Sequence, residues 1–221
     1  MRLRRLLSDL LEFFLPGACA GCAAGIPRDA VLCDACDARL PRLIPPRDPH
    51  PPAPLADCLA GAAYTDDFAS WIRRFKDPRP GLTGFDPGAE AVAFALIREA
   101  AAGLDDAPDR VVPVPQHPHR LRARGFHPAG LLAREVARTL DAPLARGALL
   151  RVRDTPSQRG LGRAARQANV RNAFRASGPV AGCIALVDDV TTTGSTLAAA
   201  ARALRRAGAQ RVVGVCAART L

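Results

Sequence analysis

The sequence predicts an α/β protein, in which helices flank a parallel or mostly parallel sheet behind a small cysteine-rich module. Beyond residue 55, short apolar runs alternate with stretches of helical periodicity, which is typical of strands joined by covering helices. Four of the seven cysteines fall within residues 19–36, and the proline-rich stretch 41–54 that follows suits neither a helix nor a central strand. We therefore expect a helix and cysteine module over 1–40, a stiff linker over 41–54 and an α/β domain over 55–221.

Composition is that of a globular protein of one or two domains, with 221 residues, 48% of them hydrophobic and 24% charged. The formal net charge of +10 points to anionic partners, but the basic residues are scattered and form no run of five or six. Of the 31 basic residues only Lys76 is a lysine, which indicates an arginine-rich coding bias. Charge alone is therefore weak evidence for nucleic-acid binding.

The N-terminus superficially resembles a signal peptide, because basic residues precede a Leu- and Phe-rich stretch. Ser8, Asp9 and Glu12 interrupt that stretch, and cleavage after Ala20 would remove Cys19 from the cysteine cluster. The spacing instead predicts an amphipathic helix packed on the protein, with its apolar face formed by Leu3, Leu6, Leu7, Leu10, Leu11 and Phe14. No run approaches the roughly 18 apolar residues that span a bilayer, so we expect a cytoplasmic protein without membrane insertion.

The clustered cysteines form two C-x-x-C pairs with ten residues between them, Cys19 with Cys22 and Cys33 with Cys36. Four thiolates on such pairs favour a tetrahedral structural Zn²⁺, since four sulfur ligands leave no open position for catalysis. Two disulfides are the alternative, which a cytosolic location disfavours. The other three cysteines are isolated in apolar surroundings, where we expect small buried residues: Cys58, Cys183 and Cys216.

Elements of the α/β domain follow from periodicity and end signals. Asp86 and Pro87 predict the start of a helix that Gly103 ends. Strands are expected over 61–64, 110–114, 144–152, 183–187 and 211–217. The other helices are expected over 67–76, from Pro128 to about Leu140 and over 196–207, the last closed by Gly208, with a poorly defined turn or helix over 164–169.

The most informative stretch begins where the buried strand 183–187 is expected to end. Asp188 and Asp189 come directly after it, at the edge where open α/β sheets bind ligands. A hydroxyl-rich loop around Gly194 then leads into a helix, and its N–H groups and the helix dipole form an anion site. We expect this phosphate cradle to consist of Val190, Thr191, Thr192, Thr193, Gly194, Ser195 and Thr196.

Two neighbouring carboxylates beside a phosphate repel one another unless they accept hydrogen bonds from hydroxyls or lie near a cation. The 2′ and 3′ hydroxyls of a ribose meet that need, and a divalent ion can lie alongside. Alternatively, Asp188 and Asp189 only cap a turn and the threonines form an ordinary helix start. The strand before the acids and the helix after them favour a ribose-phosphate site.

Residues Val187 to Thr196 resemble the 5-phosphoribosyl-1-pyrophosphate (PRPP) motif of type I phosphoribosyltransferases. Through further segments the chain resembles the ComF family over nearly its whole length. These segments are the four cysteines, Pro113-Val114-Pro115, Arg124 to Ala129, Thr155, Gln158 and Arg166 to Phe174. The chain departs from the family at His127 and Pro128, where Asn and Gln are usual, and at Lys76-Asp77-Pro78, where a Lys-aromatic pair is common.

This resemblance implies a type I phosphoribosyltransferase-like fold with a zinc-ribbon-like N-terminal module. In that fold Asp188 and Asp189 hold the ribose hydroxyls, and Thr192 to Thr196 hold the 5′-phosphate. The implied reaction displaces Mg²⁺-bound pyrophosphate from the anomeric carbon of PRPP by a nitrogen nucleophile. The resemblance also suggests a role in DNA uptake, and the alternative is a non-catalytic module that binds single-stranded DNA or the competence machinery.

The loop after Pro115 carries Arg120, Arg122 and Arg124, the cations that a pyrophosphate leaving group needs. We expect Arg124 beside the acid pair at the reaction centre, although a solvated basic loop has the same composition. His127 precedes an expected helix, so we interpret it as a cap or surface residue rather than a catalyst.

Overall fold

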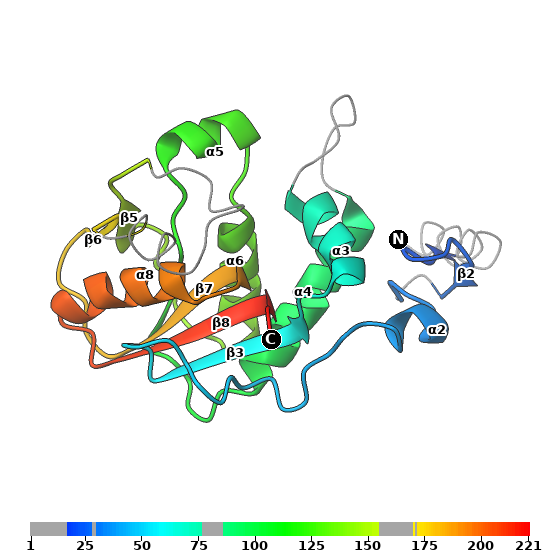
Figure 1. Cartoon of the computed structure of the whole chain (residues 1–221), viewed down its shortest axis with the longest axis horizontal. Helices are drawn as coiled ribbons and strands as arrows, with labels where there is room; N and C mark the ends of the chain where they lie inside the picture. The colour runs from blue at the N-terminus through cyan, green and yellow to red at the C-terminus, as the bar shows by residue number, and fades with distance from the viewer. Residues whose placement is uncertain (1–16, 28–29, 77–85, 155–169, 171) are drawn as a thin grey trace, which may run out of the picture.

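A four-stranded sheet forms the centre of the computed structural model, which describes residues 17–27, 30–76, 86–154, 170 and 172–221. The strand order is β3-β8-β7-β4, and every neighbouring pair is parallel (Figure 1). The strands are β3 (Asp57–Ala63), β4 (Arg110–Pro113), β7 (Cys183–Thr191) and β8 (Arg211–Arg219). The predicted parallel sheet is confirmed.

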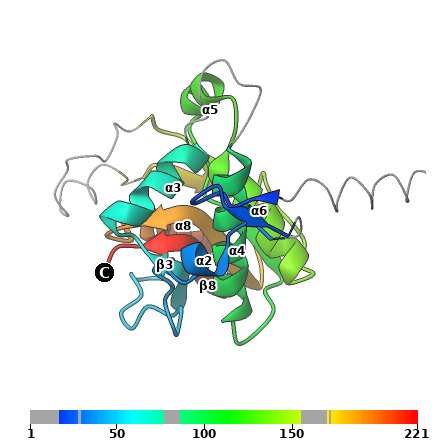
Figure 2. The ribbon, with the colours of Figure 1, turned by 90° about the vertical axis from the view of Figure 1, so that its right-hand side faces the viewer.

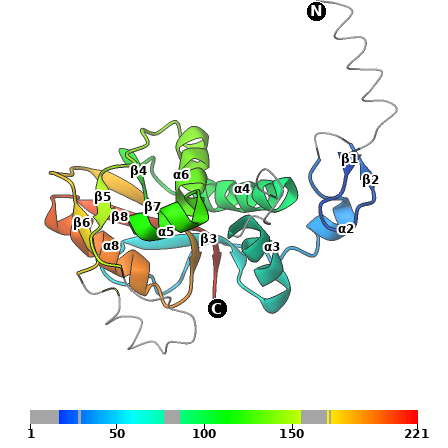
Figure 3. The same cartoon turned by 90° about the horizontal axis from the view of Figure 1, so that it is seen from above.

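Helices cover both faces of this sheet, and the alternation of residues along β7 shows why. Ile184 and Leu186 pack in the core shared with α8 (Ser195–Arg206). Ala185 and Val187 pack in the opposite core, with α4 (Pro87–Ala102) and α6 (Pro128–Thr139). Figure 3 shows α8 on one side of the sheet and the other two helices on the opposite side. Flanking of the sheet by helices is thus confirmed as well.

Helix α4 begins and ends where the sequence predicts. The Asp86 carboxylate accepts a hydrogen bond of 2.9 Å from the Ala89 N–H, Pro87 occupies the first turn, and Gly103 is the C-cap. The helix packs closely on β3, because a Cβ at Gly61 would lie 2.1 Å from the Leu96 carbonyl oxygen. Helix α3 (Asp66–Lys76) connects the end of β3 to this layer.

Several element boundaries differ from the predictions. Strand β7 continues to Thr191, four residues beyond the predicted end, because Val190 and Thr191 keep their pairing with β8. Strand β3 begins at Asp57 rather than 61. The segment 118–124 is a short helix, α5 (Pro118–Arg124), where we expected a loop.

The predicted strand 144–152 is only partly formed. Its paired part is β5 (Leu149–Arg151), which runs antiparallel to β6 (Phe174–Ala176), a strand that we did not predict. Leu144 makes a single parallel bridge to Val111 of the main sheet. The amphipathic helix expected over 3–14 and the turn over 164–169 lie outside the described residues.

The proline-rich stretch runs antiparallel along the outer edge of β3, to which it is joined by isolated bridges and hydrogen bonds. Proline lacks an N–H, so it is tolerated at such an edge, and the stretch covers backbone groups that could pair with another chain. The backbone hydrogen bonds are Ala63 N–H to Pro41, Leu43 N–H to Gly61, Ala60 N–H to Pro46 and Asp48 N–H to Cys58. The division at 40, 54 and 55 stays a prediction.

The cysteine module contains β1 (Gly17–Ala18), β2 (Gly25–Ile26) and α2 (Asp34–Asp37). Figure 2 looks onto this end of the molecule and shows the module in front of α4, with α3 beside it. Arg42 joins the parts, because its guanidinium pairs with Asp37 of α2 at 2.8 Å and with Glu99 of α4 at 3.0 Å. Among the described helices, none is both long and apolar enough to cross a membrane.

Candidate functional site

Asp188 and Asp189 lie near the end of β7, just past the point where its neighbour β4 stops. The last paired residue of β4 is Pro113, opposite Val187, so no strand of the described part of the chain covers that edge of β7 beside the two acids. The pleat directs neighbouring side chains to opposite faces. Asp189 therefore meets α3, whereas Asp188 lies on the α8 side, where Arg151 of β5 acts on its charge.

Each of the two carboxylates is anchored by the peptide that follows it. The Asp189 N–H donates to Asp188 Oδ1 at 2.9 Å, and the Val190 N–H donates to Asp189 Oδ1 at 2.6 Å. The Lys76 ammonium also contacts Asp189 Oδ1, at 2.8 Å. Within the described residues, neither Oδ2 atom has a hydrogen bond. Each acid thus has one oxygen fixed and one that can accept a hydroxyl.

Burial makes the negative charge of Asp188 costly. It raises the pKa of this carboxyl to about 7, and the charge of Asp189 adds to the effect while Lys76 opposes it. A group that donates hydrogen bonds to this carboxylate would favour its ionised form. Sugar hydroxyls are groups of that kind.

The turn after β7 consists of Thr192, Thr193 and Gly194, and α8 begins at Ser195. Gly194 is the N-cap residue with φ +69° and has no side chain to cap the helix, while the Ser195 N–H donates to Thr193 Oγ1 at 3.4 Å. The Thr193 and Ser195 hydroxyls are hydrogen-bonded at 2.7 Å. This strand–turn–helix geometry is the one that binds phosphate groups.

The predicted cradle residues therefore belong to three different elements. Val190 and Thr191 form the end of β7, where Val190 packs against the core of α3 and α4 and Thr191 is buried. Residues 192–194 form the turn, and Ser195 and Thr196 open α8. The turn 192–194 thus lies next to the two acids, whereas Val190 and Thr191 are part of the sheet.

Pro52 packs on the turn, which the sequence did not indicate. A Cβ at Gly194 would lie 2.3 Å from Pro52 Cγ, so the proline-rich stretch reaches the candidate phosphate site. A contact between residues so distant in the chain has no local signal.

Helix α5 carries the three arginines expected near a leaving group, and Arg124 lies in its last turn. Because α5 follows β4, it emerges at the same edge of the sheet as the acid pair. Arg120 lies 3.6 Å from Asp154, which precedes the segment 155–169. Of the sequence motifs, Asp77, Pro78, Thr155, Gln158, 166–169 and Arg171 lie outside the described residues.

His127 is the N-cap residue of α6, but its side chain makes no capping hydrogen bond. Its Nε2 lies 2.9 Å from the Val114 carbonyl oxygen, which ties α6 to the chain beyond β4. Burial lowers the pKa of His127, and the charges of Arg146 and Arg124 lower it further, whereas the Val114 bond and Asp189 oppose this. The neutral form of the ring is therefore favoured. Its contact with Val114 positions α6 relative to the chain beyond β4.

Lys76, like Pro52, is a residue of this site that sequence reasoning missed. Its signal was present, since it is the single lysine in an arginine-rich chain. What the sequence lacked was the contact, because α3 and β7 are far apart along the chain.

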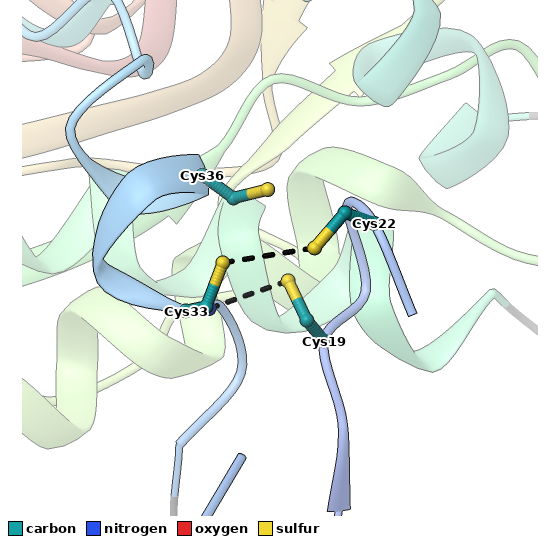
Figure 4. A group of neighbouring side chains, drawn as sticks. All are labelled: Cys19, Cys22, Cys33 and Cys36. Carbon is teal, nitrogen blue, oxygen red and sulfur yellow. Dashed lines mark hydrogen bonds between the residues drawn. The ribbon is translucent and has the colours of Figure 1, made fainter. Parts of the chain in front are cut away.

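The four clustered cysteines form a second site. Cys19 and Cys22 lie in the turn between β1 and β2, Cys33 is the N-cap residue of α2, and Cys36 lies within α2. All four sulfur atoms lie within 4.8 Å of one another, and Figure 4 shows them facing a common centre. All of these cysteines are free, so the disulfide alternative is not realised.

The chemistry of this sulfur set fits zinc. The Gly21 and Cys33 N–H groups point at Cys19 Sγ, at 3.4 and 3.3 Å. The Cys33 N–H is the main cause that lowers the pKa of Cys19 to about 6, which favours the thiolate that binds metal. Sulfur contacts with Cys22 and Cys33 raise the pKa of Cys36 to about 12. A cation bound by all four sulfur atoms would favour the thiolate form of each cysteine.

Comparison with known proteins gave several relatives, although no protein-family sequence model matches the chain. DNA utilization protein YhgH of Salmonella typhimurium is 34% identical over 213 residues, which cover 93% of this chain and 91% of that protein. The protein of the same name from Escherichia coli K12 is 33% identical over 208 residues, with the same coverage. Competence protein F of Haemophilus influenzae is 38% identical over 155 residues, 67% of this chain and 66% of that protein.

Solved structures show a more distant likeness. Glutamine PRPP amidotransferase from B. subtilis, complexed with ADP and GMP, matches with a TM-score of 0.44 and 21% identity. The match covers 66% of this chain and only 30% of that one. TT1426 from Thermus thermophilus matches with a TM-score of 0.35 and 21% identity, over 66% of this chain and 84% of that one.

Proposed function

Because this chain belongs to the ComF family of competence and DNA utilization proteins, we propose that it binds PRPP or another ribose 5-phosphate and transfers the phosphoribosyl group. The ribose lies against the edge of β7 beyond the end of β4 and donates its hydroxyls to Asp188 and Asp189. Its 5′-phosphate lies in the turn 192–194 and receives N–H groups from the start of α8. Four free cysteines suit the reducing cytoplasm, which we propose as its location.

One observation supports this proposal above the others: each acid has one oxygen fixed by the next peptide, and Oδ2 of neither acid has a hydrogen bond to another described residue. Two adjacent acceptors of this kind match the two vicinal hydroxyls of a ribose. The glycine N-cap of α8 lies five or six residues further on, where a phosphate on the same sugar requires N–H donors. If the acids only capped a turn, neither the paired acceptors nor the glycine N-cap would be required.

In the proposed reaction, the bond between the ribose C1 and the pyrophosphate oxygen breaks and pyrophosphate leaves with the electron pair. A nitrogen nucleophile forms the new bond to C1 and then loses its proton to solvent. The arginines of α5, including Arg124, stabilise the charge on the leaving group. Mg²⁺, bound to the pyrophosphate, supplies further charge neutralisation. Such a reaction depends on positioning and on charge more than on a protein nucleophile.

Isothermal titration with PRPP and Mg²⁺ tests this function, using wild type and the double variant Asp188→Asn plus Asp189→Asn. We expect the double variant to bind at least about 100-fold more weakly, since each charge-assisted hydrogen bond contributes about 1.5–3 kcal/mol. Asp66→Asn, in the exposed first turn of α3, is the matched control and should bind like wild type. Unchanged binding by the double variant would remove the acid pair from the proposal.

The second candidate function is a nucleic-acid-associated module in DNA uptake, which the names of the relatives favour. A cleft of about 490 Å³ between the cysteine module and α3 is lined by Arg39 and Trp71, among others. Aromatic and cationic side chains of this kind bind single-stranded nucleic acid. A salt-dependent gel shift of single-stranded DNA supports this function, and no shift at low salt counts against it. The two functions are compatible.

A further inference from the structure

Lys76 is unusual in the composition of this chain. Of 31 basic residues it alone is a lysine. An arginine presents a planar fork that engages both oxygens of a carboxylate, whereas a lysine is a compact charge that contacts one. A site that needs one oxygen of Asp189 left open therefore suits lysine.

The structure places that one lysine at the acid pair. Lys76 is the last residue of α3, and its Nζ lies 2.8 Å from Asp189 Oδ1. Both side chains are largely withdrawn from solvent, with 23% of the Lys76 side chain and 13% of the Asp189 side chain exposed. Phe68, Ile72 and Phe75 of α3 are buried, which fixes the helix and with it the base of Lys76.

The charge of Lys76 is stabilised where it lies. Burial lowers the pKa of the ammonium, but the charges of Asp189 and Asp188 outweigh burial and the net pKa is raised. Lys76 in turn opposes the rise in the pKa of Asp188. The ammonium thus interacts with both acids, although it touches only Asp189.

Binding of a sugar phosphate beside the two acids requires a positive charge nearby. A sugar phosphate brings more negative charge to two partly buried carboxylates, and without a cation the three groups repel one another. A divalent ion bound to both acids is one solution. At Asp189 such an ion would lie beside a positive charge that is already present, because the Lys76 ammonium contacts Oδ1 of this carboxylate.

We propose that Lys76 provides the positive charge that a divalent cation would otherwise provide beside Asp188 and Asp189, so that the sugar of a ribose 5-phosphate binds there without Mg²⁺. The inference rests on the proposed function and adds a positioning residue to it. Lys76 keeps Asp189 in place and leaves Oδ2 of both acids to the sugar hydroxyls. Mg²⁺ is then required only by the pyrophosphate group of PRPP.

Titration with ribose 5-phosphate, in EDTA and in millimolar Mg²⁺, tests this inference. Wild type should bind with the same Kd in both solutions. Lys76→Met keeps the apolar stem but loses the charge, and should bind at least about tenfold more weakly in EDTA, the effect of 1.4 kcal/mol. Mg²⁺ should restore a large part of that loss. Lys76→Arg keeps the charge and should stay independent of Mg²⁺.

Arg73→Ala, which removes an exposed cation from the same helix, is the matched control and should bind like wild type in both solutions. Circular dichroism checks that α3 and the rest of the fold persist in each variant. The inference is overturned if wild type requires Mg²⁺ for ribose 5-phosphate, or if Lys76→Met is no more dependent on Mg²⁺ than wild type. The proposed function fails in a different way, namely if wild type binds neither ribose 5-phosphate nor PRPP with Mg²⁺.

Discussion

At the scale of single residues, Asp188 should make stability depend on pH. Its pKa is raised to about 7 in the folded protein, against about 4 in an unfolded chain. Between these values the folded state holds the extra proton, so stability falls as pH rises from about 4 through about 7. The loss amounts to about 4 kcal/mol at most.

Asp188→Asn removes this titration. The melting temperature of the variant relative to wild type should therefore increase steadily from pH 5 to pH 8, as measured by thermal unfolding. Asp66→Asn is the control, and its offset from wild type should be constant over the same range. A constant offset for Asp188→Asn too would mean that the carboxyl is not held in its protonated form.

The acids and the hydroxyl turn were predictable because their signal is local. A strand, two acids, a hydroxyl-rich turn and a helix follow one another within residues 183–207. Lys76 and Pro52 were not predictable, because they reach this site from α3 and from the proline-rich stretch. Such contacts depend on how elements pack, and periodicity contains no information about them.

At the scale of elements, the proline-rich stretch is held against β3 by Arg47. The guanidinium pairs with the buried carboxylate of Asp57 at the start of β3 and with Asp105 at 2.9 Å, and donates to the Gly103 carbonyl at 3.1 Å. This pairing explains why the strand begins at a charged residue, four positions before the predicted start.

Arg47→Ala should leave Asp57 buried without its partner and lower the free energy of unfolding by about 3–5 kcal/mol, as measured in urea. Arg206→Ala, an exposed arginine at the end of α8, should change it by less than about 0.5 kcal/mol. Equal effects of the two substitutions would show that the stretch is not anchored through this pair.

Boundaries of elements were predicted best where an end signal is strong, as at Asp86 and Gly103 of α4. They were predicted worst where pairing with a neighbouring strand determines the end of the element. Strand β7 extends through charged residues because β8 continues beside it, and β5 is short because its partner β6 is short. Neither partner can be identified from the residues of the strand itself.

At the scale of the whole molecule, the cysteine module and the α/β domain should differ in their dependence on metal. The described residues of 17–40 form two short strands and one short helix, which is little structure for a module that is stable without a metal ion. The sheet and its helices have cores of their own.

Cys22→Ser plus Cys36→Ser, or a strong zinc chelator, should therefore remove amide protection from residues 17–40 in hydrogen exchange. The sheet strands should stay protected. Cys183→Ser, an isolated cysteine outside the module, should leave both regions protected. Loss of protection throughout the sheet would show that the ion stabilises the whole protein.

The fold class was predictable because alternating strand and helix patterns extend over the entire domain. The route of the chain between the parts was not, since the sequence of 41–54 indicates only an extended conformation. Its place along β3 and over Gly194 brings the proline-rich stretch to the candidate site.

A crystal structure of the protein with ribose 5-phosphate measures the central claim most directly. We predict the sugar hydroxyls within hydrogen-bond distance of Oδ2 of Asp188 and Asp189, and the phosphate against the turn 192–194 at the start of α8. A ligand bound elsewhere, with the turn and both acids untouched, would contradict the account.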